Sequence, residues 1–253
     1  MEPVSLRSNM LTYYASMVDF SRLLARIYAV ALDLPGDFFA AKLKRHSSQL
    51  RLLHYPVPHE LFQPGQLRCG AHSDLGMTTI LRNEEVSGGL EVLTPGGDWL
   101  VAPEIPNTFI VNLGDLMMRW SNDRWRSTQH RVAIPETDKW SQSRRLSFGF
   151  FVVPEYDAMV ECVSNNGSPA KYPPITVHDY RTNRFAAGAG LQHTDKTLSQ
   201  SMECFSNIAK ISVGGSSYRS HFCRKNLENV KTVFARLDLL CLGDSKIYAK
   251  GYN

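Results

Sequence analysis

The chain has 253 residues, of which 43% are hydrophobic and 21% are charged, a composition typical of a globular protein. The formal net charge is +4, and the whole excess falls in residues 191–253, where 9 Lys and Arg stand against 5 Asp and Glu. The preceding residues carry 19 of each sign, and this balance argues against nucleic acid as a partner.

Apolar residues at helical spacing predict a helix over residues 8–32, and a second short helix is expected over 37–46. From residue 49 onward, short apolar stretches between Gly, Pro and Asn turns are typical of β-strands. Strands are expected at residues 49–57, 77–83, 89–95, 98–104, 108–115, 129–135 and 144–154. This spacing predicts a sandwich, jelly roll or barrel. A turn and a short helix follow over 171–185, and Ser-rich residues 191–253 are expected not to pack on the core.

His72 and Asp74 stand two residues apart in the segment AHSDLG. Residues i and i+2 of a strand face the same side, so the pair is expected to project together toward one ion. His130 is the best third ligand, because a jelly roll brings a late strand beside an early one. Two histidines and one carboxylate form the facial triad of non-haem Fe(II) oxygenases. An isolated HxD pair also arises by chance, so the interpretation depends on further residues.

The strand RRLSFGFF separates two kinds of side chain. Arg145 and Ser147 share one face, and bulky apolar residues occupy the other. A buried arginine beside a serine needs an anion, and a guanidinium with a hydroxyl suits a carboxylate. The alternative is an exposed face on which Arg145 is solvated. Arg144 faces the opposite way and is expected to be exposed.

An HxD pair, a distant His and an RxS pair, in this order on short strands, resemble the isopenicillin N synthase-like family of Fe(II)- and 2-oxoglutarate-dependent dioxygenases. The resemblance spans residues 10–190 and includes LTYYASMVDFSRLLARIYAVALDLPGDFF, RLLHYP and YPPITVHDY. It implies a mainly β fold with flanking helices, in which an N-terminal helix packs outside a double-stranded β-helix (jelly-roll) core. It further implies truncated N-terminal helices over 1–46, the dioxygenase core over 47–190 and an atypical tail over 191–253.

By the same resemblance, His72, Asp74 and His130 bind Fe(II), while Arg145 and Ser147 hold the distal carboxylate of the cosubstrate 2-oxoglutarate. The expected reaction consumes O2 and decarboxylates 2-oxoglutarate to succinate and CO2. A small organic metabolite is hydroxylated, desaturated or ring-closed in the same turnover. The substrate is therefore expected to be a small molecule.

Tyr55 matches a tyrosine that contacts the cosubstrate in this family, whereas Leu53 stands where many plant members have an asparagine. Two alternatives stay open. One is an oxidase of the isopenicillin N synthase type that does not use 2-oxoglutarate, in which the RxS pair grips a substrate carboxylate. The other is a truncated, non-catalytic jelly roll that binds metal. Gly114 and Asp115 are expected to form a turn, and Trp120 is expected to serve packing.

The cysteines and the N-terminus bear on the compartment. The chain has 5 cysteines at irregular positions without a CxxC pair, and its first residues contain no apolar signal stretch. Both features favour reduced thiols and a cytoplasmic location. No apolar run approaches the roughly 18 residues that a membrane span needs, so no membrane partner is expected.

Overall fold

The computed structural model describes residues 3–57, 62–84, 89–103, 105–134, 143–163 and 167–188. The chain divides into two compact units, residues 1–177 and 178–253, and the site discussed below lies in the first unit. The predicted tail over 191–253 lies outside the described residues. Within the described residues, no helix has the length and apolar character needed to cross a membrane.

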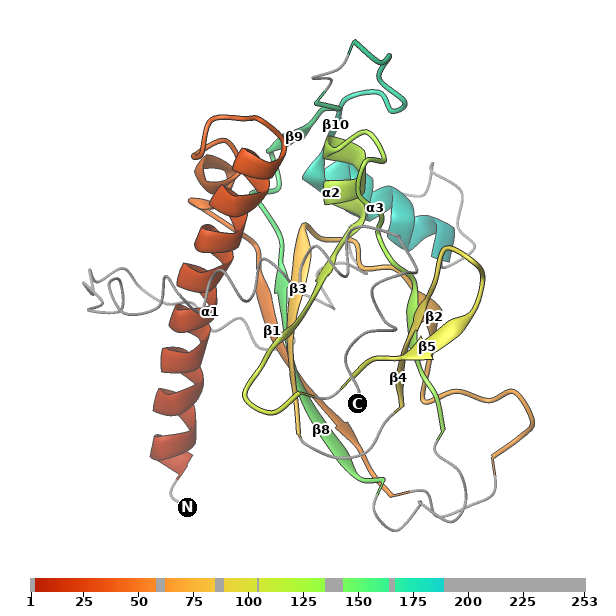
Figure 1. Ribbon diagram of the computed structural model, residues 1–253. Helices are drawn as coiled ribbons and strands as arrows, with labels where there is room; N and C mark the ends of the chain where they lie inside the picture. Colours follow the sequence, from red (N-terminus) through yellow and green to blue (C-terminus); the bar gives the residue numbers. More distant parts are fainter. Residues whose placement is uncertain are drawn as a thin grey trace, which may run out of the picture. The chain divides into compact units, whose positions relative to one another are not determined.

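The first unit is built on two antiparallel sheets (Figure 1). Sheet I contains, in spatial order, β1 (Gln49–Tyr55), β8 (Arg145–Val152), β3 (Thr78–Asn83) and β6 (Ile110–Leu113). Sheet II contains β2 (Cys69–His72), β7 (His130–Val132), β4 (Leu90–Leu93) and β5 (Trp99–Val101). A small hairpin pairs β9 (Met159–Val160) with β10 (Ile175–Thr176). Strands that are distant in sequence pair within each sheet, and the two sheets form the predicted jelly-roll core.

The described residues also contain four helical segments. They are α1 (Pro3–Ala31), the 3-10 helix η1 (Ala40–Leu43), α2 (Asp115–Trp120) and α3 (Val177–Gly188). The predicted N-terminal helix is confirmed and begins earlier than expected, whereas the predicted helix over 37–46 shrinks to η1. The expected turn at Gly114 and Asp115 was wrong, because Asp115 begins α2 and Gly114 is its N-cap.

Helix α1 packs on the outer face of sheet I, as predicted (Figure 1). Tyr13 and Tyr14 meet the rings of Phe148 and Phe150 edge-on, at centroid distances of 6.1 and 5.3 Å. Such aromatic pairs contribute about 0.5–1.5 kcal/mol each beyond the area that they bury. The apolar face of β8 is thus covered by α1. The opposite face of β8, which carries Arg145, is the inner face of the jelly roll.

Candidate metal and cosubstrate site

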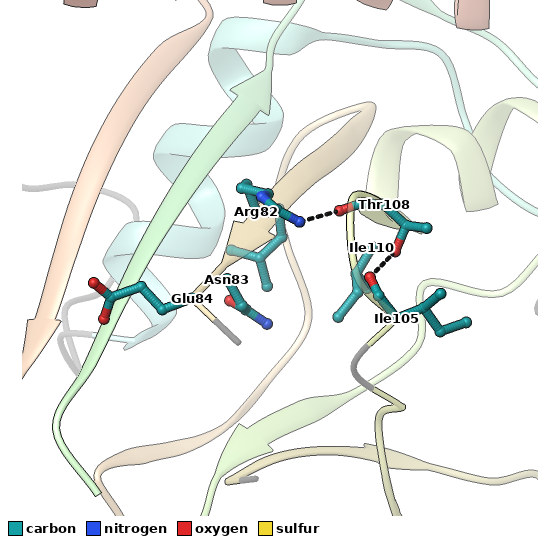
Figure 2. A pocket seen from close by; sticks show the side chains of 7 residues that line it. Arg82, Asn83, Glu84, Ile105, Thr108 and Ile110 are labelled. Atoms are coloured by element: carbon teal, nitrogen blue, oxygen red, sulfur yellow. Dashed lines mark hydrogen bonds between the residues drawn. The ribbon is translucent and has the colours of Figure 1, made fainter. Parts of the chain in front are cut away.

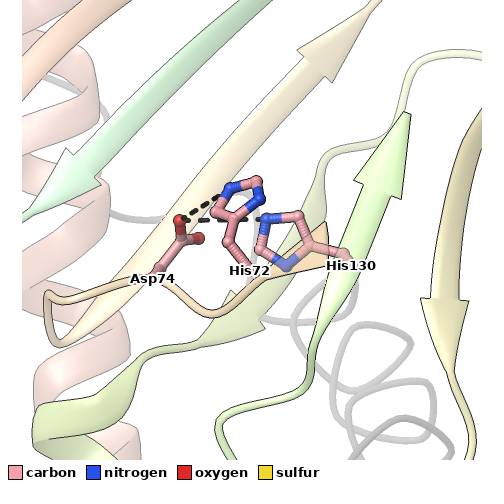
Figure 3. Close-up of side chains that lie close together, drawn as sticks. All are labelled: His72, Asp74 and His130. Atoms are coloured by element: carbon pink, nitrogen blue, oxygen red, sulfur yellow. Dashed lines mark ion pairs between the residues drawn. The ribbon is translucent and has the colours of Figure 1, made fainter. Parts of the chain in front are cut away.

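Three potential metal ligands converge at the end of β2 (Figure 3). His72 ends β2 and lies directly opposite His130, the first residue of β7, with ring centroids 4.4 Å apart. The Oδ1 atom of Asp74 lies 3.9 Å from His72 Nε2 and 3.8 Å from His130 Nε2. One ligand atom from each residue falls within 4.8 Å of the others. The structure therefore brings the three predicted residues together.

The reason for this convergence differs from the predicted one. Strand β2 ends at His72, and Asp74 lies in the loop beyond it, so the two side chains do not share a strand face. The pairing of β2 with β7 also shifts register between Cys69 and His72. Asp74 instead reaches the histidines because its loop is tied to α2.

The start of α2 holds the Asp74 loop through backbone hydrogen bonds. The amide of Asp115 donates to the Asp74 carbonyl at 2.8 Å, and the amide of Leu116 donates to the Gly76 carbonyl at 3.1 Å. These donors belong to the first turn of α2, whose amides have no partner within the helix. Gly114 lies so close to this loop that a Cβ there would overlap the Gly76 carbonyl oxygen. Glycine is therefore required where the two segments meet.

The carboxylate of Asp74 is buried and its two oxygens have different environments. Oδ2 accepts hydrogen bonds from Thr79 Oγ1 at 2.6 Å and from Asn112 Nδ2 at 2.7 Å. Oδ1 faces the two imidazoles. Two donors on one oxygen fix the rotation of the carboxylate and leave the other oxygen for a ligand. No sequence motif pointed to Thr79 or Asn112, apart from a Thr-rich start to an otherwise apolar strand.

Backbone carbonyls set the orientation of both imidazole rings. Nδ1 of His72 lies 2.8 Å from the Gly70 carbonyl, and Nδ1 of His130 lies 3.2 Å from the Thr128 carbonyl. A carbonyl only accepts, so each Nδ1 carries the hydrogen and each Nε2 is left with its lone pair in the neutral ring. A second hydrogen bond of this kind is the usual device that orients a metal-binding histidine.

The surroundings of the His72 ring favour a positive charge. The Cys69 thiol, 3.9 Å from Nδ1, raises the pKa of His72 to about 9, with further contributions from the Gly70 carbonyl and the Asp74 carboxylate. Without a cation, two nitrogen lone pairs would face an anionic oxygen less than 4 Å away. Either a proton on His72 or a metal ion resolves this repulsion, so the two compete for the site.

The donor set fits a divalent transition metal. Two imidazole nitrogens and one carboxylate oxygen suit Fe(II), and a set of three ligands leaves coordination positions for other molecules. Ligands at right angles around an ion at about 2.1 Å lie about 3 Å apart. The two separations from Asp74 Oδ1, 3.9 and 3.8 Å, are wider than this by less than 1 Å. Small side-chain movements therefore suffice to close the three ligands on an ion.

A cationic site lies on the inner face of sheet I. Arg145 and Ser147 are only 4% and 2% exposed, which excludes the alternative of a solvated strand face. Nε of Arg145 donates to Ser147 Oγ at 3.1 Å, and this bond orients the guanidinium. Tyr55 pairs with Arg145 across β1 and β8, and the guanidinium carbon lies 5.9 Å from its ring centroid. The pKa of the Tyr55 hydroxyl is raised, mainly by burial, so the hydroxyl stays protonated and able to donate.

The remaining predicted residues have structural roles. Arg144 is exposed as expected and forms an ion pair with Glu84 at 3.0 Å. Trp120 is 1% exposed and packs against Phe39, in agreement with the packing prediction. Cys69, for which the sequence suggested no partner, is a neighbour of the His72 ring.

Residues 46–154 match the family model of the 2OG-Fe(II) oxygenase superfamily. The core that these residues form is therefore similar to that of this superfamily. A 2-oxoglutarate-Fe(II) type oxidoreductase of Emericella nidulans is 36% identical over 178 residues, covering 68% of this chain and 49% of that protein. The homoarginine-6-hydroxylase of Oryza sativa is 34% identical over 177 residues, covering 66% of this chain and 52% of its own length. The chain thus spans about half the length of these relatives.

Solved structures share the fold. A full-length Neurospora crassa protein in complex with alpha-KG and thymine superimposes with a TM-score of 0.68 at 34% identity, covering 73% of this chain and 57% of that one. The rice dioxygenase for auxin oxidation superimposes with a TM-score of 0.61 at 26% identity, covering 79% of this chain and 64% of that one. These likenesses agree with the jelly-roll core described above.

Proposed function

We propose that the protein is an Fe(II)- and 2-oxoglutarate-dependent oxygenase that oxidises a small organic metabolite. The observation that carries the proposal is that the two carboxylate oxygens of Asp74 have different environments. Oδ2 accepts hydrogen bonds from two donors, while Oδ1 faces two histidine nitrogens. A structural carboxylate would not need two imidazoles beside its remaining oxygen. The named relatives, which include a hydroxylase and 2-oxoglutarate-Fe(II) oxidoreductases, support the same chemistry.

In this proposal His72, Asp74 and His130 hold the metal, and Arg145 and Ser147 bind the distal carboxylate of 2-oxoglutarate. When bound, Fe(II) and 2-oxoglutarate supply the activation of O2, with 2-oxoglutarate converted to succinate and CO2 as the substrate is oxidised. For a hydroxylation, one oxygen atom of O2 enters succinate and the other enters the product. The protein orients these groups and limits the access of water.

The protein's own groups supply the selectivity for a dicarboxylic cosubstrate. The guanidinium of Arg145 offers a planar fork to a carboxylate, and Ser147 holds that fork in place. Tyr55 keeps its proton at neutral pH and lies beside the same guanidinium. Because these side chains come from adjacent, paired strands, the site is formed by the rigid sheet and not by a loop.

The test is the formation of succinate from 2-oxoglutarate in air with added Fe(II), together with O2 uptake. We expect both in the full chain and neither in His72→Ala. Arg145→Leu should retain metal binding but lose succinate formation at low 2-oxoglutarate concentrations. O2 uptake that does not depend on 2-oxoglutarate would instead support the oxidase alternative, and the absence of both activities would support a non-catalytic jelly roll.

The substrate class and the location belong to the same proposal. Relatives and neighbours have names or bound ligands that include homoarginine, thymine and auxin, and this range supports a small polar or heterocyclic metabolite as substrate. Cys69 and Cys162 are free thiols, which supports a cytoplasmic location. The boundaries 1–46, 47–190 and 191–253 remain predictions. Limited proteolysis tests them, with early loss of 191–253 and a resistant core as the expected result.

A further inference from the structure

The side-chain amide of Asn83, the last residue of β3, is buried. Its Nδ2 and Oδ1 atoms have no hydrogen-bond partner within the part of the chain that the structure describes. Burying an amide without partners is unfavourable, and buried polar groups are nearly always paired in folded proteins. An amide with both of its polar atoms unused therefore indicates that a ligand or water binds there.

The strand register places Asn83 beside the cationic site. Asn83 lies directly opposite Ser147 in the pairing of β3 with β8, and Leu53 lies opposite Ser147 on the other flank, in β1. Cross-strand partners project from the same face of a sheet with their Cβ atoms about 5 Å apart. Ser147 is thus flanked by one apolar and one amide side chain, and Asn83 shares the inner face with Arg145.

The position along β3 distinguishes cosubstrate from substrate. Thr79, which holds Asp74, lies four residues before Asn83, or about 13 Å along the strand. A substrate carbon must lie next to the metal ligands to react, whereas Asn83 lies opposite Ser147, in the cationic part of the inner face. The ligand that extends from the metal toward Arg145 and Ser147 is the cosubstrate, and its distal end lies at the level of Asn83.

We propose that Asn83 is a further cosubstrate-binding residue, whose Nδ2 donates to the distal carboxylate of 2-oxoglutarate together with Arg145 and Ser147. This inference rests on the proposed function. Ser147 Oγ accepts from Arg145 Nε, so its own hydrogen is available to the same carboxylate. A carboxylate only accepts, so the amino group of Asn83, and not its carbonyl oxygen, faces it.

A small cavity lies beside the Asn83 side chain (Figure 2). It lies on the β6 side of Asn83 and has a volume of ≈ 20 Å³, enough for about one water molecule. Its lining residues are Leu81, Arg82, Asn83, Glu84, Ile105, Thr108 and Ile110. With the amide turned so that its oxygen faces the cavity, a water there would donate to Oδ1. Both polar atoms of the amide would then be paired when the cosubstrate is bound.

The experiment compares two 2-oxo acids in anaerobic titrations of the full chain loaded with Fe(II). One is 2-oxoglutarate and the other is 2-oxobutyrate, which lacks the distal carboxylate. The variants are Asn83→Ala, which removes the donor, and the shape-matched Asn83→Asp, which opposes one carboxylate with another. Thr108→Val is the control, because Thr108 lines the same cavity but its hydroxyl donates to the Ile105 carbonyl.

For 2-oxoglutarate we expect Kd to rise about tenfold in Asn83→Ala and about a hundredfold in Asn83→Asp, as for a lost or reversed interaction with a charged group. For 2-oxobutyrate, both variants should match the wild type within about twofold, since no distal carboxylate is present. Unchanged affinity for 2-oxoglutarate in both variants would overturn the inference, as would an equal loss for both acids. If the wild-type protein itself binds no 2-oxoglutarate, the proposed function fails rather than the role of Asn83.

Discussion

The hydroxyl of Thr79 is expected to control metal affinity although it does not touch the metal. Thr79→Val removes one of the two hydrogen bonds to Asp74 Oδ2, a contact of 2.6 Å, and leaves a side chain of nearly the same shape. A hydrogen bond to a charged group contributes about 1.5–3 kcal/mol. Loss of such a partner of a metal ligand typically weakens metal binding about 10- to 100-fold. We expect a decrease of that size.

Thr78→Val provides the matched control. Thr78 precedes Thr79 in β3 and faces the opposite side, where its hydroxyl donates to the Asn112 carbonyl at 2.7 Å and lies 3.3 Å from the Tyr28 hydroxyl. Both substitutions remove a buried threonine hydroxyl, so both should lower the free energy of unfolding by about 1 kcal/mol or more. Anaerobic calorimetric titration with Fe(II) should show weaker binding only in Thr79→Val. Equal metal affinity in the two variants would refute the role assigned to Asp74 Oδ2.

Three further outcomes follow from the packing and charge of the site. Gly114→Ala should lower the melting temperature by several degrees and weaken metal binding, because the added Cβ overlaps the Gly76 carbonyl oxygen; an unchanged melting curve would contradict this. Since the folded-state pKa of His72 is raised to about 9, its protonation stabilises the metal-free protein fully below pH 6.5, and this stabilisation is lost as pH rises through 9. Because a proton on His72 competes with the metal, metal affinity should fall about tenfold per pH unit below 9. Cys69→Ala should shift this pH dependence to lower pH. A metal affinity that calorimetry finds independent of pH would contradict this competition. Trp120→Ala should lower the free energy of unfolding by about 3–5 kcal/mol in urea titrations, and a loss below 1 kcal/mol would show that the side chain is not part of the core.

Residue spacing was sufficient to predict the parts of the site that lie on regular strands. The alternation in RRLSFGFF placed Arg145 and Ser147 on one face because side chains alternate along any strand, whatever its surroundings. His130 was predicted from its position at the start of a late strand, and the antiparallel pairing of β2 with β7 sets it opposite His72. These inferences needed only local periodicity and the jelly-roll topology.

The contacts that depend on loops and on tertiary packing were not predictable. Asp74 lies beyond β2, so the same-face reasoning does not explain how its carboxylate comes to lie beside His72. Helix α2 has only 6 residues, too few for a helical period to show in the sequence, yet its first amides hold the Asp74 loop. Asn112 lies 38 residues from Asp74, and only the pairing of β3 with β6 brings it near.

The central claim is that one site holds Fe(II) and 2-oxoglutarate together. Its most direct test is an anaerobic titration of the Fe(II)-loaded protein with 2-oxoglutarate, followed by visible absorption. We predict a saturable metal-to-ligand charge-transfer band that reaches its maximum at one 2-oxoglutarate per Fe(II) and is absent in Asp74→Ala. Fe(II) binding without any such band in the wild-type protein, or an equal band in Asp74→Ala, would contradict the claim.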